Sequence, residues 1–146
     1  REDASPKPPM GWMFRGQCNE LDHKLVNSTA KFLKESGLLK AGYNTIILNE
    51  CWMDERENGK LTPNDALGDI KTLNSELKAN GFTLGLTLLT CDQPDPADGP
   101  GYGSGSDLTK DIDTLMSWKI DYVRISSCDD SDSDDVIEDK TFHEAN

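Results

Sequence analysis

The sequence predicts an α/β protein in which strand and helix alternate around a parallel sheet. Short apolar runs rich in β-branched residues alternate with longer stretches whose apolar residues recur at helical spacing. The runs are apolar on both sides, as in strands buried between two layers. The 146 residues, 35% of them hydrophobic, suffice for one domain with its own core.

The first unit combines an extended segment over residues 8–14 with a helix over residues 22–36. Two prolines at the start of the segment exclude a helix there. Gly37 stands where a left-handed residue commonly ends a helix. The residues expected to face inward from this helix are Leu25, Thr29, Phe32 and Leu33.

Three further strands are predicted at 43–48, 82–89 and 122–126. A polar, turn-rich stretch over 54–63 leads into a second helix, which ends at Asn80-Gly81. The residues expected to face inward from the second helix are Leu67, Ile70, Leu73 and Leu77. A third helix over 108–118 is expected to bury Ile112, Leu115 and Met116.

Polar segments flank and interrupt this pattern. Residues 1–7 are predicted to be a flexible lead-in, and the Gly- and Pro-rich residues 92–106 a loop. Residues 129–135 read as an acidic linker and 136–146 as the start of a fourth helix. The folded unit is therefore expected to span 8–128.

Four strand–helix units indicate half of a (β/α)8 barrel, because a complete barrel takes about 250 residues. The alternative is a small, open, doubly wound sheet. Such a sheet commonly carries a G-x-G-x-x-G motif after its first strand, and no strand here is followed by one.

The acidic composition restricts the possible partners. The net charge is −12 at pH 7, to which five aspartates within residues 129–135 contribute. Such a surface repels phosphate backbones, so we expect no nucleic-acid partner. No apolar run approaches the length of about 18 residues that spans a bilayer, so we expect no membrane insertion.

The four cysteines, Cys18, Cys51, Cys91 and Cys128, are spaced too widely for a zinc site. Reduced core cysteines of a cytosolic protein are one interpretation. Asn27-Ser28-Thr29 is an N-glycosylation sequon, which favours oxidised cysteines and secretion. We therefore expect a secreted protein that is glycosylated at Asn27 and holds no metal or cofactor.

Several short motifs, taken in order, carry a family resemblance. They are Pro8 to Trp12, Cys18-Asn19, Ala41 to Tyr43, Cys51-Trp52, Asn80 to Leu86, Ser117-Trp118, Asp121-Tyr122 and Cys128. The series resembles family 27 of the glycoside hydrolases, the α-galactosidases. The resemblance implies the N-terminal half of a TIM barrel with disulfides Cys18–Cys51 and Cys91–Cys128.

The same resemblance implies that the chemistry has been lost. Retaining glycosidases use two carboxylates, one as nucleophile and one as acid/base. The family's nucleophile is an aspartate two residues before a cysteine at the end of the fourth strand, and Ser126 takes that position here. The acid/base is expected from the second half of the barrel. We therefore expect no catalysis; an active form would be a glycoside hydrolase of the α-galactosidase type.

The positions that hold the sugar in the family have also changed. Asn49 and Glu50 replace two aspartates before Cys51-Trp52, and Arg124 replaces a lysine. Thr87 and Leu89 stand where the family has a tyrosine and an aspartate.

Two pairs of residues at this site allow either a binding or a structural role. Trp12 and Trp52 could stack on a sugar, although core packing is the favoured interpretation. Glu50 and Arg124 could form a polar pocket, although an ion pair is favoured.

Three functions follow from these observations. The first is a secreted, non-catalytic structural or assembly protein, in which another copy or a second chain completes the barrel. The second is a lectin-like module that binds glycans through Trp12, Glu50 and Trp52. The third is a fragment of an α-galactosidase-type hydrolase.

Overall fold

The computed structural model describes residues 8–91, 103–105 and 108–127. The predicted lead-in, acidic linker and fourth helix, together with most of the predicted loop over 92–106, lie outside these residues.

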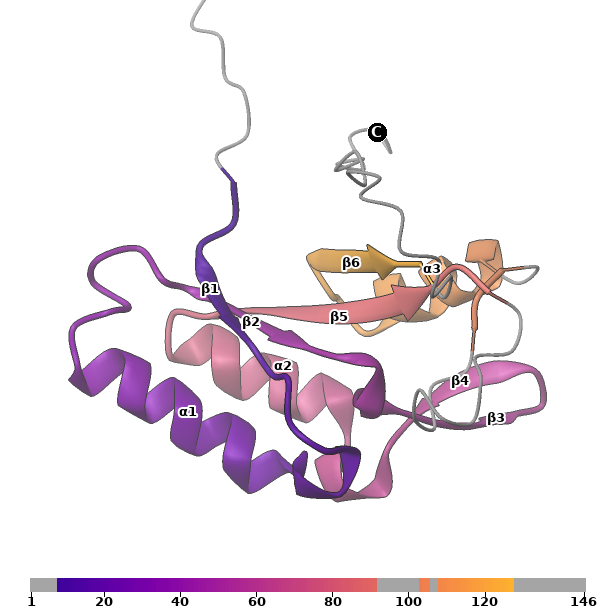
Figure 1. Ribbon diagram of the computed structural model, residues 1–146, viewed down its shortest axis with the longest axis horizontal. Coiled ribbons are helices and arrows are strands. Elements are labelled where there is room, and N and C mark those ends of the chain that lie inside the picture. Colours follow the sequence, from indigo (N-terminus) through magenta and orange to yellow (C-terminus); the bar gives the residue numbers. More distant parts are fainter. Residues whose placement is uncertain (1–7, 92–102, 106–107, 128–146) are drawn as a thin grey trace, which may run out of the picture.

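Four parallel strands form the central sheet in the order β1-β2-β5-β6, which confirms the predicted parallel α/β architecture (Figure 1). They are β1 (Gly11–Met13), β2 (Thr45–Leu48), β5 (Thr83–Leu89) and β6 (Tyr122–Ser126). Helices α1 (His23–Glu35) and α2 (Ile70–Ala79) lie along one face of this sheet, and α3 (Leu108–Ser117) precedes β6. Each crossover thus returns the chain parallel to the preceding strand, as in a barrel.

Helix α1 begins at a cap that its sequence supplies. The side chain of Asp22 accepts a hydrogen bond of 2.6 Å from the backbone N–H of Leu25. Past its other end, Gly37 has φ 82°, as predicted for a left-handed residue. The buried residues of this helix are Val26, Ala30 and Leu33.

The predicted inward face of α1 is therefore partly wrong. Leu33 is buried, but Leu25 is exposed and Phe32 is 61% exposed. Val26, Ala30 and Leu33 also follow helical spacing, and this stripe faces the sheet in place of the one through Leu25 and Phe32.

Helix α2 confirms three of its four predicted core residues, since Ile70, Leu73 and Leu77 are buried on it. Leu67 is also buried but belongs to the preceding 3₁₀ turn, η3 (Asp65–Leu67). The helix ends at Ala79, Asn80 caps it, and Gly81 follows with φ 90°.

Helix α3 departs further from the prediction. Leu115 is buried and Ile112 is partly buried, but Met116 is 60% exposed. The other residue buried on this helix is a charged one, Asp111. Its burial depends on Arg56, described below.

The polar, turn-rich stretch over 54–63 lies in an antiparallel hairpin. It consists of β3 (Met53–Glu57) and β4 (Lys60–Pro63), joined by Asn58 and Gly59. In Figure 1 this hairpin extends from the carboxyl end of β2. The alternation of buried Leu61 with its exposed neighbour Lys60 is typical of a strand with one buried face.

The two faces of the sheet differ in burial. Ile46, Leu48, Leu84 and Leu86 are fully buried, as expected beneath the helices. Ile47, Gly85 and Tyr122 form a row on the opposite face, because residues paired across parallel strands project to the same side. A Cβ on Gly85 would lie 2.6 Å from Tyr122 Cδ1 and 3.1 Å from Ile47 Cγ1, so the three positions are in direct contact. Ile47 and Tyr122 are partly exposed, and no helix among the described residues covers this open face in Figure 1.

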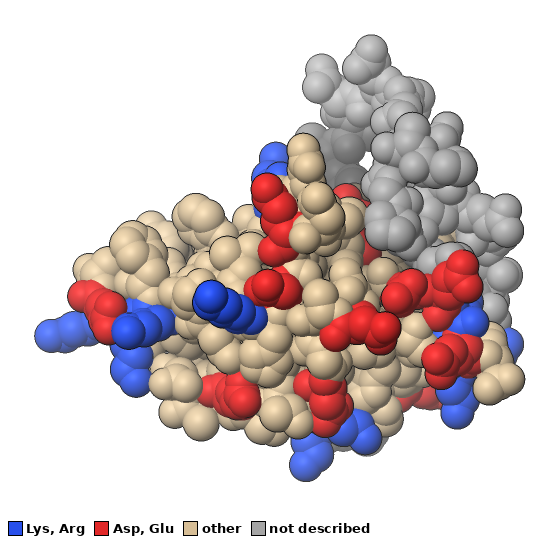
Figure 2. All heavy atoms as spheres, turned by 90° about the horizontal axis from the view of Figure 1, so that it is seen from below, with Lys and Arg blue, Asp and Glu red and all other residues tan. Residues whose placement is uncertain are grey.

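The side of the molecule that carries the helices is charged and mixed. Figure 2 shows acidic side chains across the middle and right of this view, with basic side chains interspersed and at the left. Among the described helices, none combines the length and apolar character needed to cross a bilayer.

Candidate functional site at the strand ends

The residues predicted to form the site lie at one edge of the sheet. Asn49 and Glu50 directly follow β2, and Ser126 is the last residue of β6. Because all four strands are parallel, their carboxyl ends meet at this edge. In α/β barrels the loops at the carboxyl ends of the strands carry the active site.

The register places four of these residues on the open face. Thr87 pairs with Arg124, and Leu89 pairs with Ser126. These pairs follow Gly85 and Tyr122 by two and four residues, so they project to the same side of the sheet. Thr87 is fully buried, whereas Arg124 and Ser126 are partly exposed.

Ser126 is held by the sheet but has no histidine available to it in the described part of the chain. Its backbone carbonyl accepts a hydrogen bond of 3.0 Å from Thr90 N–H. His23 is the one histidine among the described residues, and it contacts Leu67 O at 3.0 Å and Glu76 Oε2 at 2.8 Å, between α1 and α2. A serine hydroxyl without a positioned base is a weak nucleophile.

The predicted ion pair between Glu50 and Arg124 is wrong: both residues are described, and no ion pair joins them. The strand order explains this result, since β5 lies between β2 and β6. Two strands separated by a third are about 10 Å apart.

The two tryptophans differ in role. Trp52 is fully buried, and its indole Nε1–H donates a hydrogen bond of 2.7 Å to the Thr87 carbonyl oxygen. Its ring also meets Trp118 edge-on, with centroids 6.0 Å apart and an angle of 89°. The core-packing prediction is therefore confirmed for Trp52.

Trp12, by contrast, is 50% exposed, so the core-packing prediction is wrong for this residue. It lies on β1, an edge strand whose one neighbour in the described sheet is β2. Its register partner is Ile46, which lies on the helix-covered face. Trp12 is thus an exposed aromatic residue on the side of the sheet opposite to Arg124 and Ser126.

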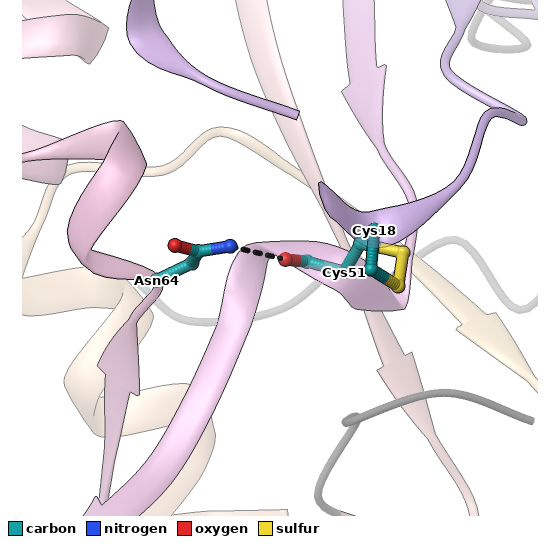
Figure 3. Close-up of a disulfide and its surroundings, with 3 residues drawn as sticks. All are labelled: Cys18, Cys51 and Asn64. Atoms are coloured by element: carbon teal, nitrogen blue, oxygen red, sulfur yellow. Dashed lines mark hydrogen bonds between the residues drawn. A yellow bond between two sulfur atoms is a disulfide. The ribbon is translucent and has the colours of Figure 1, made fainter. Parts of the chain in front are cut away.

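A disulfide ties the ends of the first two strands together (Figure 3). Cys18 begins the 3₁₀ turn η1 (Cys18–Glu20), and Cys51 lies in η2 (Glu50–Trp52), with Cα atoms 4.8 Å apart. The side-chain amide of Asn64 donates a hydrogen bond of 3.4 Å to the Cys51 carbonyl. The predicted Cys18–Cys51 pair is confirmed.

The second predicted disulfide is only partly described. Cys91 is disulfide-bonded. Its expected partner, Cys128, lies outside the described residues.

The sequon residue Asn27 lies inside helix α1 rather than on a loop. It is partly buried, and its Nδ2 donates a hydrogen bond of 3.0 Å to Glu76 Oε2. Glycosylation at Asn27 stays a prediction.

The sequence did not reveal a buried ion pair between Arg56 and Asp111. The guanidinium of Arg56 donates to both carboxylate oxygens of Asp111, at 2.7 and 2.6 Å, and to the carbonyl of Gly103 at 2.8 Å. The pair joins the hairpin to α3 and to the described part of the loop. The Asn58-Gly59 dipeptide between two short runs signals a hairpin and could have placed Arg56 on a strand.

Parallel strands, helices on one face and polar residues at the carboxyl ends together define a protein of the (β/α)8-barrel class. The chain belongs to the α-galactosidase family: residues 7–145 match the family model described as Alpha galactosidase A. This confirms the family resemblance of the sequence motifs.

Two curated relatives illustrate the match. An alpha-galactosidase of Coffea arabica is 32% identical over 136 residues, which cover 85% of this chain and 34% of the relative. Alpha-galactosidase A of Aspergillus niger is 34% identical over 134 residues, which cover 84% of this chain and 23% of the relative. The chain thus spans between about a quarter and a third of the length of these relatives.

Solved structures support the same fold. Alpha-galactosidase I from Mortierella vinacea superposes with a TM-score of 0.75 at 29% identity, covering 83% of this chain and 31% of that one. An α-galactosidase from Saccharomyces cerevisiae gives a TM-score of 0.75 at 24% identity, covering 86% and 28%. The four strands of the parallel sheet therefore correspond to part of a TIM barrel.

Proposed function

We propose that this chain belongs to a secreted, non-hydrolytic member of the α-galactosidase family and serves as a structural or assembly subunit. One observation carries the proposal: the position that the family resemblance assigns to the nucleophile, at the end of β6, is Ser126. An aspartate there would form a glycosyl ester, whereas a hydroxyl needs a base to remove its proton.

The residues near Ser126 in the sheet support the proposal that the chain does not hydrolyse glycosides. Its register partner is Leu89, an apolar and largely buried residue. Two residues earlier, Thr87 pairs with Arg124. The residues that β5 and β6 carry toward the strand ends on the open face thus offer hydroxyl, guanidinium and isobutyl groups, and no carboxylate.

The exposed parts of the sheet support an assembly role. Among the described strands, β1 and β6 are the edges, and the open face carries the partly exposed Ile47 and Tyr122. Unpaired strand edges and apolar faces favour association. We propose that another copy, a second chain or a further part of the same protein completes the barrel.

Secretion is proposed from the chemistry of the cysteines. The Cys18–Cys51 disulfide and the disulfide-bonded Cys91 are stable in oxidising compartments. Mass spectrometry of the natural protein tests this, because secretion predicts oxidised cysteines throughout.

A second candidate function is glycan binding, which the half-exposed indole of Trp12 favours. Exposed aromatic rings are suitable surfaces for the apolar faces of sugars. Such a site would lie on the side of the sheet opposite to Ser126, because Trp12 pairs with Ile46. Binding to a glycan array that is lost in Trp12→Ala would support this function. If the protein binds no glycan, the assembly role is the function that these observations support.

The principal test is hydrolysis of a chromogenic α-galactoside by the native, full-length protein. We expect no turnover above that of Ser126→Ala. Turnover by the natural protein that disappears in Ser126→Ala would overturn the proposal.

A further inference from the structure

The tip of the β3–β4 hairpin is a two-residue turn formed by Asn58 and Gly59. Both residues have positive φ, 52° and 75°, as a type I′ turn requires. The pair Glu57 and Lys60 closes the hairpin beneath them. Asn58 and Gly59 are both exposed.

An asparagine followed by glycine is chemically reactive, because glycine has no side chain to shield its backbone nitrogen. The Gly59 nitrogen attacks Cγ of Asn58 and loses its proton to solvent, and ammonia leaves from Cγ. The product is a five-membered cyclic imide. Water then opens the ring: cleavage of the bond from nitrogen to Cγ gives aspartate, and cleavage of the bond from nitrogen to the main-chain carbonyl carbon gives isoaspartate.

The chain contains a second Asn-Gly dipeptide, Asn80-Gly81. Hydrogen bonds hold both of its reacting groups, the side-chain amide of Asn80 and the backbone nitrogen of Gly81. Asn80 Nδ2 donates to Glu76 O at 2.9 Å, and its Oδ1 accepts from Lys34 Nζ at 3.3 Å. The attacking nitrogen, Gly81 N, donates to Lys78 O at 3.0 Å. Ring closure at Asn80 therefore requires these hydrogen bonds to break.

The hairpin tip has no such restraint. In the described part of the chain, neither the side-chain amide of Asn58 nor the Gly59 N–H makes a hydrogen bond. We propose that Asn58 is a site of spontaneous deamidation in the folded protein and that Asn80, with the same following residue, is protected.

The modification would reach the interior through Arg56. Gly59 O accepts a hydrogen bond of 3.3 Å from Arg56 Nη1, the atom that also donates to Asp111. Isoaspartate adds one atom to the main chain immediately before Gly59 and a negative charge beside Glu57. The added atom shifts the backbone of the turn that Arg56 contacts, and the added charge changes the electrostatic potential there.

The two sites can be compared in one experiment. The full-length native protein is incubated in mildly alkaline buffer, and the loss of each amide is followed by peptide mapping and mass spectrometry. We expect Asn58 to react more than about tenfold faster than Asn80, since each hydrogen bond that must open at Asn80 lowers its reactive population roughly fivefold. In urea-unfolded protein the two rates should become similar.

Equal rates in the folded protein, or an Asn58 that stays intact while Asn80 reacts, would overturn the proposal. Asn58→Gly is the matched control, because Gly-Gly also suits a type I′ turn and has no amide to lose. Destabilisation that accumulates on incubation in the natural protein and not in Asn58→Gly would show that the modification acts through the hairpin.

Discussion

Arg56 and Asp111, which are 55 residues apart, form a bidentate ion pair with hydrogen bonds of 2.7 and 2.6 Å. The carboxylate of Asp111 is fully buried, and the side chain of Arg56 is 16% exposed. Arg56 also donates to Gly103 O, so one guanidinium joins the hairpin, α3 and the segment next to the end of β5. Ser104 N–H in that segment donates to Leu89 O at 2.9 Å.

Arg56→Met is therefore expected to destabilise the protein strongly, since it leaves a buried carboxylate without its cation. Removing one partner of a buried ion pair costs about 3–5 kcal/mol. Urea denaturation of the full-length protein measures the loss in free energy of unfolding. The double variant Arg56→Met/Asp111→Leu should recover most of it, because no buried charge remains.

A matched control for this prediction is Lys78→Met, which removes the exposed ion pair with Asp121. Exposed pairs contribute about 0–1 kcal/mol. Equal losses for Arg56→Met and Lys78→Met would mean that the buried pair does not hold the hairpin.

The contact between His23 and Glu76 predicts a pH dependence. His23 faces two acceptors, since Nδ1 meets Leu67 O and Nε2 meets the Glu76 carboxylate. Only the protonated ring can donate to both. The hydrogen bond to Glu76 is accordingly the main cause that raises the pKa of His23 above 6.5, despite the opposing effect of burial. The pKa of Glu76 is lowered from 4.5, first by Asn27 and then by His23.

The direction of the effect follows from these two pKa shifts. The contribution of His23 is complete below pH 6.5 and is lost as the pH rises through the higher pKa of the folded state. The contribution of Glu76 is present above pH 4.5 and is lost as the pH falls through its lower folded pKa. The free energy of unfolding of the natural protein, compared with that of His23→Gln over a pH series, should differ most between these two values. A difference that grows as the pH rises above neutrality would contradict this prediction.

Replacing each tryptophan with alanine is expected to change the free energy of unfolding by very different amounts. Trp52→Ala should lower the free energy of unfolding by about 3–5 kcal/mol, since it empties a fully buried site and leaves Thr87 O without its donor. Trp12→Ala should change it by about 0.5 kcal/mol or less, because Trp12 is half-exposed. Similar losses in the two variants would show that Trp12 is a packing residue after all.

The disulfide predicts a large effect on the unfolded chain. Cys18 and Cys51 are 33 residues apart, and closing a loop of that length contributes about 3–4 kcal/mol under the chain-entropy model. Replacing both cysteines with serine should lower the free energy of unfolding by that amount. An unchanged midpoint of urea denaturation would contradict the prediction.

The parallel sheet could be predicted because Ile46, Leu48, Leu84 and Leu86 lie in apolar runs whose local pattern matches their buried environment. The Arg56–Asp111 pair could not, because the burial of a charge depends on a partner 55 residues away. Helix α1 carries two apolar stripes with similar spacing, and the local pattern does not show which one faces the sheet. The prediction chose the stripe through Phe32, which is exposed. The observed strand order is the sequential one of the predicted half barrel, and it places β5 between the strands that carry Glu50 and Arg124.

Covalent labelling tests the central claim most directly. The full-length native protein is incubated with an activated fluorinated galactoside, chosen so that the glycosyl–enzyme ester of an active α-galactosidase breaks down slowly, and its intact mass is measured. With Ser126 at the strand end we expect the mass to stay unchanged. A stoichiometric glycosyl adduct on any residue of the barrel would contradict the proposed loss of catalysis.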